Sequence, residues 1–453
     1  MPTRVLIPAG ALGLGFDVAA LWRGIETRPD IIVIDGGSTD SGPHYLGTGT
    51  SKYSRAATKA EWKLLMEARA RAGVPLAIGT AGTCGTDAMV DRMYDITCEI
   101  AAELGQSLKI ARLYSEQDPA AVEAALKAGK IRPLWPEQPL DETVPDTCSH
   151  IVALAGAEQI TAALETGADI VIAGRCTDTA PIAALPLLRG EHPGAAWHGA
   201  KIGECGALCS TNPTSGVIVI DFDRTGFTVR PMAEGARCTP ELVAAHMLYE
   251  NADPQILHEP GGRLDVRAAS HEQADETAVR VSGAIWHEGP YGVKLEGARQ
   301  VGFQSCALVL LRDPAYVAQA EKWCALLEAR LHREIPARLE LARGDYHLEL
   351  RQIGRNATLG ALETASASPA EIGVLLIATA ADQATAREIA RLANPHLLHM
   401  PLSDTEPQAT HAFPFSPPEW DRGALHEFCL NHVLACDDPM TPFRLCTDEV
   451  HHA

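Results

Sequence analysis

The sequence predicts an α/β protein, with a parallel, doubly wound sheet in the N-terminal half and a mixed α+β second domain. Runs rich in Val, Ile and Leu recur through the first 200 residues, and stretches with the 3.6-residue apolar spacing of helices separate them. Continuous apolar runs are typical of parallel strands that helices bury on both faces. After about residue 200, extended segments broken by Gly and Asp become more frequent, which indicates a different architecture.

The first half contains strand-like and helix-like segments in alternation. The expected strands are 5–10, 30–37, 74–82, 108–116 and 168–175, and the expected helices are 16–27, 56–73, 87–105, 119–130 and 156–167. In the second half, the expected strands are 216–222, 226–231, 278–290, 291–311 and 346–354, and the expected helices are 315–336 and 385–396. We therefore predict a parallel α/β domain over 1–200, a mixed, strand-rich α+β domain over 201–400, and a C-terminal wrapping or docking tail over 401–453.

Composition excludes several classes of protein. The 453 residues carry 38 basic and 58 acidic side chains, a net charge of −20, so no basic footprint for nucleic acid exists. No apolar run reaches the roughly 18–20 residues that cross a bilayer, and we expect no membrane association. The twelve cysteines are scattered rather than arranged as a disulfide framework. This pattern favours a cytoplasmic location.

Polar and glycine residues follow several of the expected strands. They are Asp35, Gly36 and Gly37 after the second strand, Gly82, Thr83, Cys84 and Gly85 after the third, and Arg175 and Asp178 after the fifth. Each loop alone is explained by the preference of turns and helix N-caps for Gly, Thr and Asp. Because ligands bind at the carboxyl ends of strands in such sheets, the recurrence favours a shared pocket.

The segment WHGAKIGECGALCSTNPTSG, residues 197–216, is a second dense cluster. Glu204 beside Cys205 offers a proton-transfer group and a soft nucleophile or metal ligand, whereas a capped turn with buried thiols is the structural alternative. Glycines 10, 13 and 15 have the spacing G-x-x-G-x-G instead of the dinucleotide fingerprint, and no phosphate-binding loop is present. We identify no cofactor, and the sequence leaves open whether a divalent metal binds at Asp35, Asp178 or Glu204.

These motifs together resemble the acyclic terpene utilisation protein A (AtuA) family. The resemblance rests on GLGFDVAAL, DIIVIDGG, IGTAGTCGTD, ADIVIAGRCTDTAP, IGECGALCSTNPTSG, VKLEGARQVGF and HAFPFSPPEWDRG, and it covers nearly the whole chain. It implies a role in the breakdown of branched or acyclic carboxylic acids, some as coenzyme A thioesters. Many members have a fused C-terminal ferredoxin-like domain that has no obvious equivalent here, which implies a separate partner protein of about 100 residues. The family pattern points to Arg175, Asp178, Glu204 and Cys205, with Asp35 and the glycines lining the pocket.

We expect a lyase of hydratase or dehydratase type that acts on a small branched carboxylate or its acyl-CoA thioester, in a homo-oligomer. Arg175 would bind a carboxylate through its guanidinium, and Asp178 and Glu204 would share acid/base catalysis. Two alternatives stay open. One is a hydrolase with Cys205 as nucleophile, aided by His198 or Glu204, and the other is a non-catalytic subunit that binds an acyl ligand. A nicotinamide oxidoreductase ranks last because the dinucleotide fingerprint is not matched.

Overall fold

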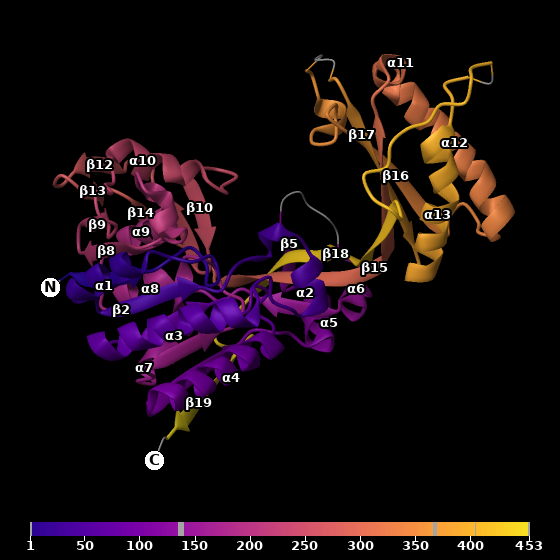
Figure 1. Ribbon diagram of the computed structural model, residues 1–453. Coiled ribbons are helices and arrows are strands. Elements are labelled where there is room, and N and C mark those ends of the chain that lie inside the picture. Colours follow the sequence, from indigo (N-terminus) through magenta and orange to yellow (C-terminus); the bar gives the residue numbers. More distant parts are fainter. Residues whose placement is uncertain (1, 135–139, 366–368, 404, 452–453) are drawn as a thin grey trace. The chain divides into compact units, whose positions relative to one another are not determined.

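A computed structural model describes residues 2–134, 140–365, 369–403 and 405–451 (Figure 1). The chain divides into two compact units, unit 1 with residues 1–299 and 428–453 and unit 2 with residues 300–427. The chain passes from one unit to the other within strands β15 (Gly292–Leu311) and β18 (Glu419–Ala435). Among the described residues, no helix combines the length and the apolarity that a bilayer span requires.

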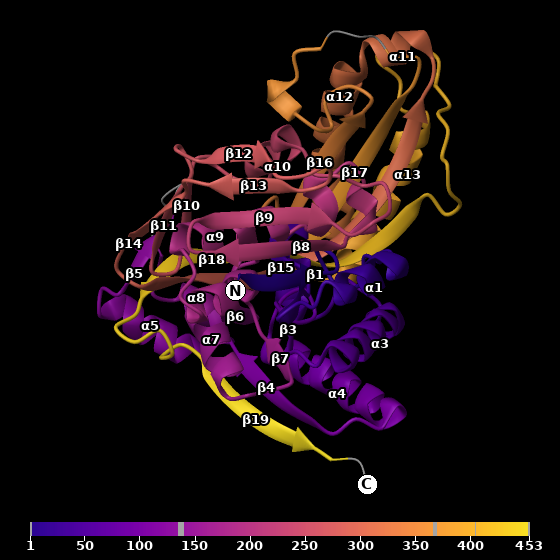
Figure 2. The same ribbon diagram turned by 90° about the vertical axis from the view of Figure 1, so that its left-hand side faces the viewer.

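In the described part of unit 1, ten strands form a mixed sheet in the order β12-β13-β9-β8-β1-β2-β3-β7-β4-β19. The pairs β1–β2, β2–β3, β3–β7 and β7–β4 are parallel, and the outer pairs are antiparallel. Figure 2 shows β13, β9, β8 and β1 side by side. The predicted α/β class with parallel strands is thereby confirmed. The strands are β1 (Thr3–Ile7), β2 (Ile31–Asp35), β3 (Leu76–Gly79), β4 (Leu108–Tyr114), β7 (Ile170–Ala173), β8 (Ile218–Asp223), β9 (Gly226–Pro231), β12 (Ser270–Gln273), β13 (Val279–Ser282) and β19 (Arg444–Val450).

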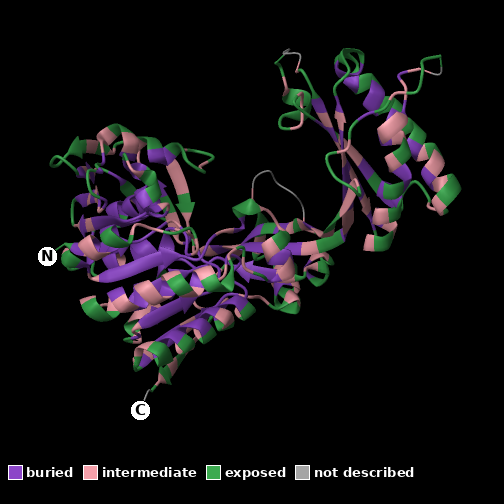
Figure 3. Cartoon of the chain, viewed as in Figure 1, coloured by how far each residue is buried: buried purple, intermediate pink, exposed green. Residues whose placement is uncertain are grey.

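Helices pack on both faces of this sheet. Successive side chains of each strand point to opposite faces, so each strand contributes to two cores. In β1, Val5 and Ile7 belong to the core beneath α7, α8 and α9, whereas Leu6 belongs to the core beneath α1, α3 and α4. Figure 3 shows the resulting layer of buried strands between helices whose outer surfaces are exposed. The central strands are therefore shielded on both faces, and their carboxyl ends remain for a binding site.

Local sequence signals fix where several helices of unit 1 begin. Asp17, Ser54 and Asp118 act as N-caps, and the Asp17 side chain accepts a hydrogen bond from the backbone N–H of Ala20 at 3.0 Å. The helices are α1 (Val18–Glu26), α2 (His44–Thr48), α3 (Arg55–Ala72), α4 (Asp87–Leu104), α5 (Pro119–Lys127), α6 (Val144–Thr147), α7 (Ala157–Glu165), α8 (Ala180–Leu188), α9 (Pro193–Gly203) and α10 (Pro240–Ala245), with short 3₁₀ helices η1 (Thr39–Ser41), η2 (Gly206–Cys209), η3 (Pro213–Ser215) and η4 (His246–Leu248).

Smaller strand pairings complete unit 1. An antiparallel sheet has the order β10-β11-β14 among the described residues. Strand β6 pairs with the first part of β15, and β5 pairs with the last part of β18. The bounds are β5 (Ile131–Pro133), β6 (His150–Ala153), β10 (Ile256–Glu259), β11 (Gly262–Asp265) and β14 (Ile285–Glu288).

Unit 2 has its own core. Strand β17 pairs antiparallel with β16 on one side and with residues 303–311 of β15 on the other. Helices α12 and α13 contribute to the buried cluster around Trp323, whose indole N–H donates to the carbonyl of Met400 at 2.9 Å. The bounds are β16 (Tyr346–Ile353), β17 (Ile372–Ala380), α11 (Pro314–Ala318), α12 (Ala320–Leu339), α13 (Gln383–His399) and η5 (Gly360–Leu362).

Candidate functional site

A pocket of about 500 Å³ opens at the carboxyl ends of the parallel strands of unit 1, and we call it the strand-end pocket. Its walls come from the segments after β1, β2 and β7, the segment that follows α9, and the segment that follows η4. The lining residues are Ala9, Gly10, Ala11, Leu14, Gly15, Asp35, Gly37, Ser38, Asp40, Ser41, Lys52, Tyr53, Asp178, Glu204, Cys205, Leu208, Pro213, Thr214, Gly216, Tyr249 and Glu250. The strand ends therefore do converge with the second sequence cluster.

The lining is strongly acidic. It contains five carboxyl side chains and one ammonium group, that of Lys52. Five predicted site residues lie here together, namely Asp35, Gly37, Asp178, Glu204 and Cys205. Tyr53 and Glu250 also line the pocket, and no motif of the sequence indicates them. A ligand in this pocket would be surrounded by carboxyl oxygen atoms on several sides. This favours ligands with neutral hydrogen-bonding groups or positive charge over free anions.

Asp35, the last residue of β2, is buried in the wall. Its Oδ2 accepts a hydrogen bond from the backbone N–H of Gly37 at 3.1 Å, and its Oδ1 has no partner among the described residues. Burial and then the charge of Asp178 raise the pKa of Asp35 well above its ordinary value. Burial likewise raises the pKa of Asp178, with opposition from the Arg175 guanidinium. Both acids thus hold a proton to higher pH than solvated Asp does.

The raised pKa of Asp35 predicts a pH-dependent effect of Asp35→Asn on stability. The proton on Asp35 stabilises the folded chain fully below the ordinary Asp pKa, about 3.9, and this contribution is lost as the pH rises through the raised folded-state pKa. Asn has no proton to lose. The free energy of unfolding of Asp35→Asn should therefore increase relative to wild type as the pH rises, which urea unfolding at about pH 5 and about pH 9 measures.

Asp223→Asn is the matched control, because the hydrogen bonds from Arg280 lower the pKa of Asp223 instead. This variant should be less stable than wild type by the same amount at both pH values. A difference between Asp35→Asn and wild type that stays constant or decreases with pH would contradict the assignment of Asp35.

Arg175 lies behind the pocket wall, with 4% of its surface exposed, and is not among the lining residues. Its Nε donates to Glu296 Oε2 at 3.1 Å, and its Nη1 donates to Asp178 Oδ1 at 3.4 Å and to Thr80 Oγ1 at 3.2 Å. Burial works to lower the pKa of Arg175, but Glu296 and Asp178 outweigh it and raise that pKa. In this arrangement the guanidinium orients Asp178, and its predicted role as a substrate clamp stays a prediction.

The other predicted loop residues shape the wall without lining the strand-end pocket. Gly85 has φ +64°, and a Cβ there would lie 2.1 Å from the backbone nitrogen of Arg175, so only glycine permits this approach. The hydroxyl of Thr83 accepts from the backbone N–H of Lys52 at 3.1 Å. Gly36 donates its N–H to the carbonyl of Gly79 at 2.7 Å. Gly82 lines a separate cavity of about 10 Å³, and Cys84 is buried.

Glu204 is held by Lys201, one turn earlier in the same helical segment. Glu204 caps the C-terminus of α9, and the Lys201 ammonium donates to its Oε1. Burial raises the pKa of Glu204 to about 8, against the opposing effect of Lys201. A further buried acid, Glu259, has its pKa raised to about 7 by burial. The i,i+3 spacing of Lys201 and Glu204 is a signal that the sequence already contains, whereas no local pattern indicates Glu259.

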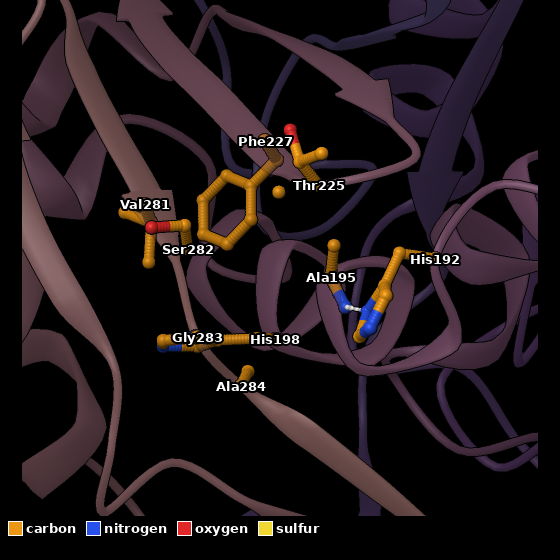
Figure 4. Close-up of a pocket in the computed structure, with 10 residues that line it drawn as sticks. His192, Ala195, His198, Thr225, Phe227, Val281, Ser282, Gly283 and Ala284 are labelled. Atoms are coloured by element: carbon orange, nitrogen blue, oxygen red, sulfur yellow. Dashed lines mark hydrogen bonds between the residues drawn. The ribbon is translucent and has the colours of Figure 1, made fainter.

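Two histidines near this cluster have different settings. His198 lies in α9 and faces a cavity of about 10 Å³ whose walls include Phe227 and Ala284 (Figure 4). It does not line the strand-end pocket, and burial lowers its pKa to about 3. His246, in contrast, has a side-chain nitrogen close to Glu204 and Cys205, and the three ligand atoms lie within 4.8 Å of one another. The histidine beside Cys205 is therefore His246.

The fold and site define an α/β protein whose parallel strands deliver carboxyl groups to one pocket. The protein-family model described as acyclic terpene utilisation family protein AtuA matches residues 48–414 of this chain. The chain belongs to this family, which confirms the resemblance seen in the sequence and supports a catabolic role. Neither a curated protein nor a solved structure matches the chain.

Proposed function

We propose that this protein is a hydro-lyase that adds water to, or removes it from, a branched acyl group presented as a thioester. The observation that carries the proposal is the convergence of Asp178 and Glu204, from distant segments of the chain, on the strand-end pocket. In the dehydration direction, a base takes the proton from the carbon beside the thioester carbonyl, the hydroxyl on the next carbon gains a proton from an acid, and its C–O bond breaks to release water. The products are the unsaturated thioester and one water molecule.

Asp178 is the base in this proposal. Its side chain is 30% exposed, faces the pocket and is oriented by Arg175, and burial shifts its pKa upward, toward neutral pH. Carboxylates whose pKa approaches the working pH are efficient in proton transfer. Glu204 lies on another wall of the pocket and activates the departing oxygen, and Asp35 lines the same pocket.

The lining favours the thioester over the free acid. A carboxylate would enter a pocket with five acidic side chains and a single lysine, whereas the acyl part of a thioester is neutral. Leu14 and Tyr249 line the same pocket with 63% and 43% of their surfaces exposed, and they offer apolar contact to a branched chain. The positively charged ammonium of Lys52 would attract the negatively charged coenzyme A part of the thioester.

Solvent exchange tests this function. The protein is incubated in D₂O with the 3-methylbut-2-enoyl and 3-hydroxy-3-methylbutanoyl thioesters of coenzyme A, and separately with the two free acids. We expect interconversion of the two thioesters, with deuterium entering the carbon beside the carbonyl. We expect neither conversion nor exchange of the free acids.

Conversion of the free acids with inert thioesters would contradict the choice of substrate. A covalent acyl adduct on Cys205, seen by intact mass and accompanied by release of free acid, would favour the Cys-dependent hydrolase. That second candidate is retained because Cys205 is among the residues that line the pocket. Thermal stabilisation by thioesters without conversion would favour a non-catalytic acyl-binding subunit. A cytoplasmic location, a homo-oligomer and a separate small partner chain remain predictions.

A further inference from the structure

We propose that Glu204, Cys205 and His246 form a binding site for one transition-metal ion of the Zn²⁺ type. The proposal rests on the strand-end pocket of the proposed function and specifies how Glu204 activates the departing oxygen there. One carboxylate oxygen, one sulfur and one imidazole nitrogen lie within 4.8 Å of one another. Ligand atoms at about 2.0–2.3 Å from a tetrahedral ion lie about 3.5 Å apart, so small side-chain rotations would complete the geometry.

The imidazole of His246 supplies an independent observation. His246 is 5% exposed, and its Nε2 is buried without a hydrogen-bond partner among the described residues. The ring stacks on Tyr249 at a centroid distance of 5.8 Å, and it makes a hydrogen bond to the backbone of Lys201. Metal-binding histidines show this arrangement, in which one nitrogen is anchored by the backbone and the other binds the ion. An unpartnered buried nitrogen costs stability, which an ion would recover.

The donor set selects the class of metal. Calcium and magnesium require oxygen ligands, whereas a mixed set of oxygen, sulfur and nitrogen suits Zn²⁺ and its neighbours. Catalytic zinc sites have three protein ligands and keep one position open. Glu204 and Cys205 line the strand-end pocket, so the open position would face the substrate. An ion there would act as a Lewis acid on a substrate oxygen.

The positive charge of the Lys201 ammonium opposes the binding of a cation at this site. It binds Oε1 of Glu204, which leaves Oε2 for the ion. The acids Asp35, Asp178 and Glu259 lie in or beside the same pocket, and the acidic surroundings offset the charge of Lys201.

Metal binding is measured on the whole chain after chelator treatment and titration with Zn²⁺ or Co²⁺. We expect one equivalent of either ion per chain, and a near-ultraviolet thiolate-to-cobalt absorption in the Co²⁺ form. Cys205→Ser should abolish this absorption, and His246→Gln should weaken binding at least about tenfold. The controls Cys98→Ser and His347→Gln, outside the cluster, should bind as wild type does.

The proposal is overturned if neither ion binds stoichiometrically to the wild-type chain, or if the thiolate-to-cobalt absorption survives Cys205→Ser. Circular dichroism shows whether each variant is folded. If a variant is not, the titration of the wild-type chain still tests whether the metal site exists. The D₂O experiment separates this proposal from the proposed function. Metal binding without thioester conversion contradicts the hydro-lyase alone, whereas conversion by a chain that binds no metal contradicts the metal site alone and leaves Glu204 as proton donor.

Discussion

Arg175→Met is expected to lower the free energy of unfolding by about 3–5 kcal/mol, the largest stability change in the molecule that we predict. Arg175 is the central cation of a buried network in which Glu296 has 6% of its side chain exposed. Burial would raise the pKa of Glu296, but Arg175 and Lys294 lower it to about 2, so this carboxylate depends on its two cations. Removal of Arg175 leaves Glu296 with the ammonium of Lys294, at 2.7 Å, and the neutral hydroxyl of Thr39, at 3.0 Å.

Urea unfolding of the variant and of Arg175→Met/Glu296→Gln measures this effect. The double variant should recover part of the loss, because the uncompensated carboxylate is then absent. Arg444→Met is the control, since the Arg444 side chain is 60% exposed and its ion pair with Asp87 should contribute less than about 1 kcal/mol. A loss of less than about 1 kcal/mol for Arg175→Met would mean that the network does not support the site.

Asp178→Asn is expected to lower the rate of thioester conversion by about 10²–10⁴-fold, with little change in KM. Asn has nearly the same shape and can still accept the hydrogen bond from Arg175, but it cannot take the proton from carbon. Steady-state kinetics and deuterium incorporation measure the effect separately on kcat and on proton transfer.

Asp40→Asn is the matched control for that experiment. Asp40 is an exposed acid of the same pocket, and its charge also raises the pKa of Asp178. Its removal should change the rate by only a small factor, since we assign no proton transfer to it. Near-normal conversion by Asp178→Asn would remove Asp178 from the mechanism.

Much of unit 1 could be predicted from the sequence because its signals are local. The continuous apolar runs of β2 and β7 show that both faces of these strands are buried, and Asp35 and Asp178 lie at or just after their ends. The change near residue 200 also has a structural counterpart. From β8 onward, the strands added beside β1 are antiparallel.

Long-range pairing could not be predicted in this way. Strand β19 lies in the predicted C-terminal tail, yet it pairs with β4, more than 300 positions earlier in the chain. Glu296 binds Arg175 across 121 positions of the chain. The sequence therefore could not show whether the Arg175 guanidinium is exposed to a substrate or buried in an ion pair. His246 reaches Cys205 through the turn after α10, and no motif connects them. Such partners are determined by tertiary packing and leave no periodic signal.

A crystal structure of Asp178→Asn, soaked with the 3-hydroxy-3-methylbutanoyl thioester, tests the central claim most directly, because the inactive variant retains its substrate. We predict an acyl group in the strand-end pocket, with its α-carbon beside the substituted side chain and its hydroxyl toward Glu204. An acyl group bound elsewhere on the chain, with the strand-end pocket empty, would contradict the assignment of this pocket as the active site.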